Sequence, residues 1–132
     1  MTVSDSDLVN AATEARRNAY ARYSGFTVGA ALIDDQGRLH VGCNVENAAY
    51  PLGSCAEAGA ISAMVQEGGR RIVRIAVIGG LNEVGSCTPC GGCRQRIAEF
   101  ADENTVILAI DDSGEWVEYT VAALLPASFH LP

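Results

Sequence analysis

Apolar and polar residues alternate along the chain in blocks that predict four helices and five strands. Apolar residues at helical spacing, from Leu8 to Ala19, predict a first helix capped by Ser4 or Ser6. The apolar run over 72–78 is broken only by Arg74 and favours a central strand covered on both faces. In chain order, the predicted elements are a helix ending near Arg22, strands over 26–33 and 39–45, a helix over 55–66, a strand over 72–78, a helix over 90–100, a strand over 105–110, an edge strand over 116–119, and a short helix capped by Thr120 that ends before Pro126.

The order of these elements predicts an α/β fold. The strands over 26–33 and 39–45 flank the turn sequence Asp34-Asp35-Gln36-Gly37 and are expected to form a hairpin. The β-α-β units that follow place helices on both faces of the sheet. We therefore expect a single domain over 1–132, built as a three-layer αβα sandwich around a mixed central sheet of about five strands.

Composition narrows the class of protein. The chain has 132 residues, 48% hydrophobic and 19% charged, which is typical of a globular domain. A net charge of −7 argues against a nucleic-acid polymer as partner, because surfaces that bind phosphates are basic, and favours a small-molecule ligand. No stretch reaches the ~20 apolar residues of a membrane span, and segment 1–7 does not resemble an export signal. Five cysteines without such a signal predict a cytoplasmic location and a metal-binding or catalytic use of the thiols.

Three short segments carry the candidate chemistry: Cys55-Ala56-Glu57, Pro89-Cys90 and Cys93. Cys90 and Cys93 have the C-x2-C spacing that binds one tetrahedral metal from a helical turn, and Cys55 supplies a third thiolate. Three protein ligands leave a fourth position for water, which is typical of catalytic zinc. Glu57 is close enough in sequence to transfer protons at that water, although alone it could be an ordinary first-turn acid. The combination is the signature of zinc-dependent nucleobase deaminases.

Other interpretations of the cysteines remain open at this point. The C-x2-C pair could be a chance spacing or a redox pair, and Cys87 extends it to a run that resembles an iron–sulfur motif. With Cys55, Cys87 could instead complete a four-cysteine structural zinc site, or it could be a small buried hydrophobe. Cys43 is expected in the core, His40 in a structural or exposed position, and His130 in solvent.

Nearly the whole chain resembles the small homotetrameric cytidine deaminases, and the ordered set of motifs is specific to that family. The segments that carry the resemblance are AYARYSGFTVGAAL (19–32), GCNVENAAY (42–50), CAE (55–57), PCGGCRQ (89–95) and LLPASF (124–129). The resemblance implies one zinc ion per subunit and a homotetramer with shared active sites. It also implies a nucleoside substrate, with no nucleic-acid polymer and no membrane as partner.

The resemblance assigns roles position by position. Cys55, Cys90 and Cys93 match the zinc ligands, and Glu57 matches the proton-shuttling acid. The positions that match substrate contacts are Asn44 and Glu46 for the ribose hydroxyls, Phe26 for the pocket wall, Tyr50 near the subunit boundary, and Phe129 for an aromatic that reaches the pyrimidine from a neighbouring subunit. Separately, the backbone near Ala56 and Thr88 is well placed in the sequence to hold the polar edge of the base. Alternatively, the two phenylalanines belong to the core and Asn44 and Glu46 are turn residues.

The chain departs from the family directly after the acid, where many relatives have Arg and this chain has Ala58. Three thiolates on Zn²⁺ leave a net negative charge that weakens activation of water, so we expect Arg94, next to Cys93, and the two helix ends to balance it. The predicted activity is zinc-dependent hydrolytic deamination of cytidine and 2′-deoxycytidine to uridine and 2′-deoxyuridine, in pyrimidine salvage. The alternatives are deamination of another aminopyrimidine nucleoside or nucleoside antibiotic, and a non-catalytic module with four-cysteine zinc.

Overall fold

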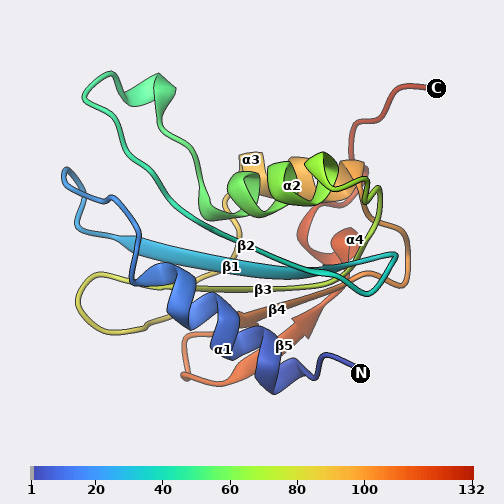
Figure 1. The fold of residues 1–132 in the computed structure, drawn as a ribbon, viewed down its shortest axis with the longest axis horizontal. Helices are drawn as coiled ribbons and strands as arrows, with labels where there is room; N and C mark the ends of the chain where they lie inside the picture. The colour runs from blue at the N-terminus through green and yellow to red at the C-terminus, as the bar shows by residue number, and fades with distance from the viewer. Residues whose placement is uncertain (1) are drawn as a thin grey trace.

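A five-stranded mixed sheet organises the chain in the computed structural model, which describes residues 2–132 (Figure 1). The elements are α1 (Asp5–Arg16), β1 (Thr27–Asp34), β2 (Leu39–Cys43), the 3₁₀ turn η1 (Tyr50–Leu52), α2 (Ala56–Gln66), β3 (Ile72–Gly80), α3 (Gly91–Glu99), β4 (Val106–Ile110), β5 (Trp116–Tyr119) and α4 (Val121–Leu124). The strand order is β2-β1-β3-β4-β5, and among the neighbouring pairs of this sheet β3 and β4 are parallel while the others are antiparallel. The predicted α/β fold with a mixed sheet is confirmed.

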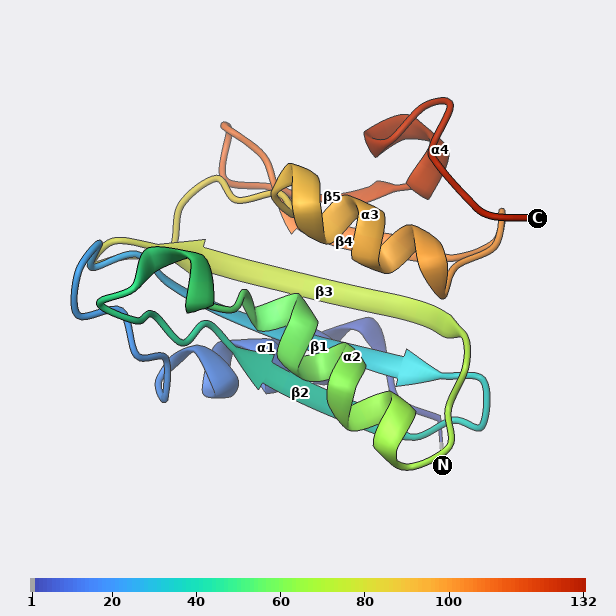
Figure 2. The ribbon, with the colours of Figure 1, turned by 90° about the horizontal axis from the view of Figure 1, so that it is seen from above.

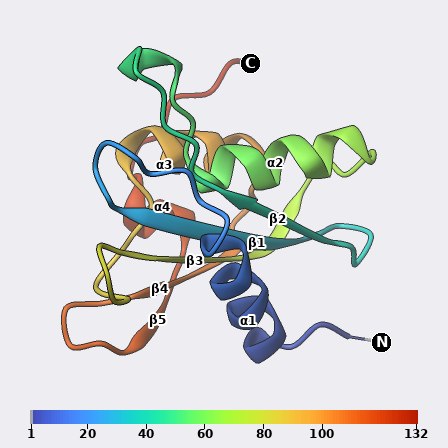
Figure 3. The same ribbon diagram turned by 60° about the vertical axis from the view of Figure 1, so that its left-hand side comes forward.

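The sheet lies between two helical layers. Figure 3 shows α1 on one face and α2 with α3 on the other. Seen from above in Figure 2, α2 lies over the β1–β2 half of the sheet and α3 over the β3–β5 half. The two helices that carry the cysteine motifs therefore lie side by side on one face.

Alternation along the strands explains why both faces of the sheet are apolar. In β1, Leu32 packs into the core beneath α2, whereas the neighbouring Ala31 packs into the core beneath α1. In β3, Val77 and Ile78 divide between the same two cores. Successive side chains of a strand point to opposite faces, so a strand covered on both sides needs a continuous apolar run. The run over 72–78 is thus the central strand, as predicted, and β5 is at the sheet edge, as predicted.

Glycines allow the helices to approach the sheet closely. A Cβ atom on Gly42 of β2 would overlap the carbonyl oxygen of Ala56 and would lie 2.5 Å from the nitrogen of Ala60. No side chain fits at that distance, so glycine sets how near the first turn of α2 lies to β2. Because the motif Cys55-Ala56-Glu57 lies at that turn, this contact positions the candidate site.

Some predicted boundaries are wrong. The first helix ends at Arg16 and not near Arg22, because the following segment leaves the helix and pairs with the 44–46 segment. The nitrogen of Tyr20 donates to the carbonyl of Asn44, and the nitrogen of Glu46 donates to the carbonyl of Tyr20. Cys43 is only half-buried, because it ends β2 and does not lie in its centre.

The ring of His40 is buried and contacts two carboxylates, in agreement with a structural position. Its Nε2 lies 2.8 Å from Asp34 Oδ2, and its Nδ1 lies 3.5 Å from Glu67 Oε2. His130 is exposed, as predicted. No helix within residues 2–132 combines the length and apolar character needed to cross a membrane.

Candidate metal centre and nucleoside pocket

The first turns of two helices hold the three predicted metal ligands. Cys55 is the N-cap residue of α2, and Cys90 is the N-cap residue of α3. Cys93 lies in the first turn of α3 and is fully buried. Unpaired backbone N–H groups and the helix dipole give each N-terminus partial positive charge, which stabilises thiolates.

The three sulfurs form one cluster that fits a tetrahedral zinc. The Sγ atoms of Cys55 and Cys90 are 3.8 Å apart, and all three Sγ atoms lie within 4.8 Å of one another. Two sulfurs that bind the same tetrahedral zinc, each at about 2.3 Å, are about 3.8 Å apart. Cys87 is not part of this cluster among residues 2–132. A three-sulfur donor set therefore suits a catalytic zinc and argues against both the four-cysteine site and the iron–sulfur run.

The thiols need a cation to remain ionised together. Burial raises the pKa of Cys55 and of Cys93. Nearby negative charge, including that of Cys90 and Glu57, adds to both shifts, although a hydrogen bond with Cys93 offsets part of the rise in the pKa of Cys55. Burial also acts on Cys90, but hydrogen bonding, led by the backbone N–H of Cys93, outweighs it and lowers the pKa of Cys90. Zinc binding requires deprotonated cysteines, so the metal and the helix ends together hold three negative charges in one place.

Glu57 lies beside the cluster in the first turn of α2. Its side chain is buried, with 3% of the residue exposed. Burial raises the pKa of Glu57, while backbone and Cys93 hydrogen bonds and the positive charge of Arg96 offset only part of that effect. A carboxylate with a raised pKa exchanges protons more readily near neutral pH, which is the property of a general acid–base group.

The structure moves the expected arginine contact from Arg94 to Arg96. The guanidinium of Arg94 donates to the carbonyl oxygens of Pro89 and Leu124 and to Thr88 Oγ1, so it ties the ligand loop to α4. Nη1 of Arg96 instead lies 3.5 Å from Cys93 Sγ. Neighbours in sequence point in different directions from a helix, whereas residues three apart share a face. The spacing from Cys93 could have identified Arg96, but adjacency in sequence favoured Arg94.

A cavity of about 200 Å³ opens on the cluster and on Glu57. Its other lining residues are Phe26, Val28, Asn44, Ala56, Val77, Cys87 and Thr88. Five predicted site positions, Phe26, Asn44, Ala56, Glu57 and Thr88, thus share a cavity with Cys55 and Cys90. Val28, Val77 and Cys87 were not identified as pocket residues from the sequence, because a strand pattern does not show which positions border a cavity. Burial raises the pKa of Cys87 to about 11, so this thiol is neutral at physiological pH.

The two predicted ribose contacts are hydrogen-bonded within the chain. Asn44 accepts a bond from the nitrogen of Val28 and donates to the carbonyl of Phe26, each at 2.8 Å. Glu46 accepts bonds from the backbone nitrogens of Tyr23 and Ser24 at 2.8 and 3.0 Å, and from the hydroxyl of Ser24. These bonds, led by those to Ser24, lower the pKa of Glu46 and keep its carboxylate ionised.

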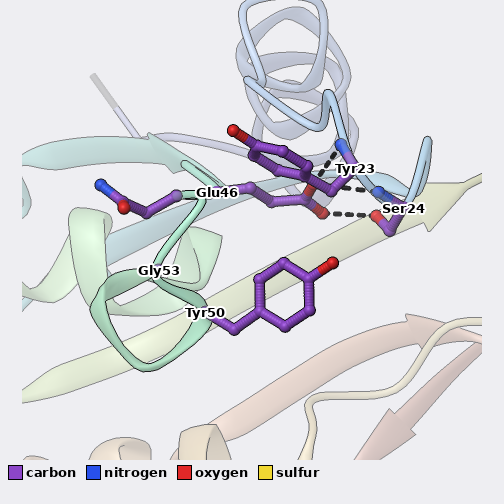
Figure 4. A pocket seen from close by; sticks show the side chains of 6 residues that line it. Tyr23, Ser24, Glu46, Tyr50 and Gly53 are labelled. Atoms are coloured by element: carbon purple, nitrogen blue, oxygen red, sulfur yellow. Dashed lines mark hydrogen bonds between the residues drawn. The ribbon is translucent and has the colours of Figure 1, made fainter.

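Glu46 borders a second cavity of about 340 Å³ (Figure 4). Figure 4 shows the carboxylate of Glu46 bound to the Tyr23–Ser24 backbone, with Tyr50 across the pocket. The rings of Tyr23 and Tyr50 meet edge to face, with centroids 6.0 Å apart. Tyr50 is 75% exposed, so a large apolar surface stands at the rim of this cavity.

Phe129 does not line either cavity. The residue is 71% exposed, and its carbonyl oxygen accepts a hydrogen bond from Gln95 Nε2 at 2.9 Å. The C-terminal segment is therefore tied to α3 near the metal centre, while the aromatic ring of Phe129 faces away from the core of its own chain.

Sequence comparisons match this geometry to a known family. Residues 2–109 match the family model described as the cytidine and deoxycytidylate deaminase zinc-binding region. A cytidine deaminase of Sporosarcina psychrophila is 41% identical over 122 residues, covering 92% of this chain and 88% of that protein. A cytidine deaminase of Mycobacterium tuberculosis is 43% identical over 96 residues, covering 73% of this chain and 71% of that protein.

Solved structures of cytidine deaminases share the fold. The enzyme from Burkholderia pseudomallei has a TM-score of 0.85 at 38% identity, over 96% of this chain and 99% of that one. The enzyme from Mycobacterium tuberculosis has a TM-score of 0.82 at 38% identity, over 97% of this chain and 99% of that one. The match extends over the sheet, the helices and the segments that carry the cysteine cluster.

Proposed function

Because the chain belongs to the cytidine and deoxycytidylate deaminase family, we propose that it hydrolyses cytidine and 2′-deoxycytidine to uridine and 2′-deoxyuridine. The reaction replaces the C4–N bond of the base with a C4–O bond and releases ammonia, as in pyrimidine salvage. The observation that carries the proposal is the position of Glu57, buried beside a three-thiolate cluster and lining a cavity with Phe26 and Asn44.

Cys55, Cys90 and Cys93 would hold zinc, which when bound would lower the pKa of a water molecule from ~15.7 toward ~7 and so supply a nucleophile at neutral pH. Glu57 accepts the proton of that water and delivers it to ring N3. After attack at C4, Glu57 takes the proton of the new C4 hydroxyl and passes it to the exocyclic amine, so the C4–N bond breaks, the C4 carbonyl forms and ammonia leaves. Burial of Glu57 supports this role, because a carboxyl pKa raised toward neutral suits a group that must both accept and release protons.

The cavity walls supply orientation. Phe26 offers an apolar surface for the base. The side-chain amide of Asn44 is held by hydrogen bonds to the backbone of Phe26 and Val28, so it presents a rigid polar edge. We infer that Asn44 and Glu46 meet the ribose hydroxyls, since a carboxylate beside an amide can accept and donate hydrogen bonds to a sugar. Backbone groups near Ala56 and Thr88, which line the same cavity, face the polar edge of the pyrimidine.

The decisive experiment measures ultraviolet absorbance loss on cytidine, 2′-deoxycytidine and other aminopyrimidine nucleosides, with zinc content determined on the same sample. Glu57→Gln should keep one zinc per chain and lose turnover by about 10²–10⁴-fold, the contribution of general acid–base catalysis. Glu103→Gln, at an exposed position after α3, is the matched control and should retain full activity. A Glu57→Gln protein with wild-type rates would rule out this role for Glu57, and turnover restricted to a different nucleoside would replace the substrate.

We also propose a cytoplasmic homotetramer whose active sites are shared between subunits. Five free cysteines support a reducing compartment. Exposed apolar side chains support burial against other copies, and those of Tyr50, Leu52, Phe129 and Leu131 are each more than 70% exposed. In this assembly, Phe129 of one subunit reaches the pyrimidine bound to its neighbour.

A further inference from the structure

The metal centre carries more negative charge than its zinc ion neutralises. Three thiolates on one dication leave a net charge of −1. Cys55 and Cys90 are N-cap residues, so each benefits from the unpaired N–H groups of its helix. Cys93 lies one turn further along α3, and its backbone N–H already donates a hydrogen bond to Cys90. Of the three sulfurs, that of Cys93 therefore has the least backbone support.

The guanidinium of Arg96 provides positive charge at this sulfur. Its Nη1 lies 3.5 Å from Cys93 Sγ, within the range of a hydrogen bond to sulfur. Arg96 folds back toward the N-terminus of its own helix, over Gly92, where an added Cβ would lie 3.4 Å from Nη1, an ordinary contact distance. The guanidinium is therefore not crowded on this side.

The facing helix leaves room as well. Ala58 of α2 and Arg96 of α3 line one open cavity of about 370 Å³ between the two helices. Because Ala58 ends at Cβ, its side chain does not compete for the space in front of Cys93. The guanidinium of Arg94, by contrast, donates hydrogen bonds to the carbonyl oxygens of Pro89 and Leu124.

We propose that Arg96 is a positioning residue of the zinc site, whose guanidinium neutralises the Cys93 thiolate and thereby stabilises the zinc-loaded cluster. Three thiolates on one dication leave excess negative charge, so a fixed positive charge within 3.5 Å of one of these sulfurs favours the zinc-loaded form. The same charge withdraws electron density from sulfur, which leaves zinc a stronger Lewis acid. This inference rests on the zinc chemistry of the proposed function but not on the identity of the nucleoside.

Zinc release from the holoenzyme into excess chelator tests the proposal without substrate. Arg96→Met keeps an unbranched stem and removes the charge, and we expect zinc to leave about fivefold faster, as for a strong but solvent-exposed charge pair. Arg96→Lys retains the charge, so its rate of zinc release should fall between those of wild type and Arg96→Met. Arg17→Met, just after α1, lowers the net charge equally at an exposed site where the arginine pairs with Glu14, and it should match wild type.

Cobalt substitution gives a second readout. Removing the guanidinium makes the Cys93 thiolate a stronger donor, so the sulfur-to-cobalt charge-transfer band of Arg96→Met should move to lower energy. An Arg96→Met protein with the zinc release rate and cobalt band of wild type would overturn the proposal. Arg96→Gln repeats both measurements if the Met variant does not fold. An error in the assigned nucleoside would leave both readouts unchanged and would show only in the substrate panel.

Discussion

Asp34 is the most strongly perturbed carboxylate away from the metal centre. Its side chain is fully buried and accepts hydrogen bonds from His40, from the backbone of Gln36 and from both the backbone and side chain of Arg38. Burial acts to raise its pKa, but these bonds outweigh burial and lower the pKa of Asp34 to about 2 from 3.8. The arrangement closes the β1–β2 hairpin and, through Arg38 Nη1 and the carbonyl of Glu67, joins it to the end of α2.

A depressed carboxyl pKa stabilises the fold above the unfolded value and loses that contribution as the pH falls. Asp34 should therefore contribute about 2 kcal/mol above pH ~4, lost progressively as the pH approaches 2. We expect Asp34→Asn to lower the free energy of unfolding at pH 7 by at least that amount, and the gap from wild type to narrow below pH 4. Urea unfolding followed by circular dichroism from pH 2 to 7 measures both. Asp112→Asn, at an exposed turn, should have the unfolding free energy of wild type at every pH. A stability difference between Asp34→Asn and wild type that did not change with pH would contradict the role of the lowered Asp34 pKa.

At the scale of single residues, the sequence predicted the cysteine cluster but not all of the residues around it. Cys55, Cys90 and Cys93 form one cluster, as predicted, because local spacing and helix starts constrain them. Arg96 was not predicted as the contact of Cys93, and Cys87 was considered as a fourth metal ligand but not as a residue that lines the cavity. Their positions depend on which face of a helix or loop meets the cavity, and that is decided by packing between elements distant in the sequence.

At the scale of elements, the contact between β2 and α2 links the hairpin to the metal centre. A Cβ at Gly42 would overlap the backbone of the first turn of α2. Gly42→Ala should push this turn outward, lower the free energy of unfolding by about 1–3 kcal/mol and weaken zinc retention, because Cys55 moves with the turn. Gly85→Ala adds the same methyl group where nothing lies within 4 Å, so it should leave both quantities near wild type. Unfolding curves and zinc release rates, measured for Gly42→Ala and Gly85→Ala, separate local crowding from a general effect of alanine. Equal zinc retention in the two variants would contradict the link between the β2–α2 contact and the metal centre.

The type of an element could be predicted where its segment has one periodic pattern. The boundaries of the elements could not be predicted in the same way. The apolar run of β3 and the hairpin turn at 34–37 define their elements locally. The end of α1 does not, because the residues after Arg16 could continue a helix but instead make backbone bonds to segment 44–46. Tertiary hydrogen bonds thus overrode local helical preference.

At the scale of the whole molecule, the exposed Phe129 and Tyr50 predict that a single chain lacks part of its active site. Each is more than 70% exposed, although apolar side chains of this size are normally covered. Closed symmetric assembly of the kind common among homo-oligomers would bury them and bring Phe129 to a neighbouring cavity. Light scattering on the zinc-loaded protein should give about four times the chain mass of 13.8 kDa.

Complementation between two impaired variants tests the shared site directly. Glu57→Gln removes the proton-transfer group of its own subunit, and Phe129→Ala removes the aromatic that its subunit contributes to a neighbour. Co-expressed with different tags and purified as mixed tetramers, the pair should regain activity at about one quarter of the sites, those that combine an intact Glu57 with an intact Phe129 from the next subunit. Mixed tetramers of Glu57→Gln with a Glu57→Gln, Phe129→Ala double variant provide the control and should remain inactive. Activity of the mixed tetramers no greater than the mean of the two parent proteins would show that Phe129 does not act across a subunit boundary, because a residue serving its own site gains nothing from a neighbour.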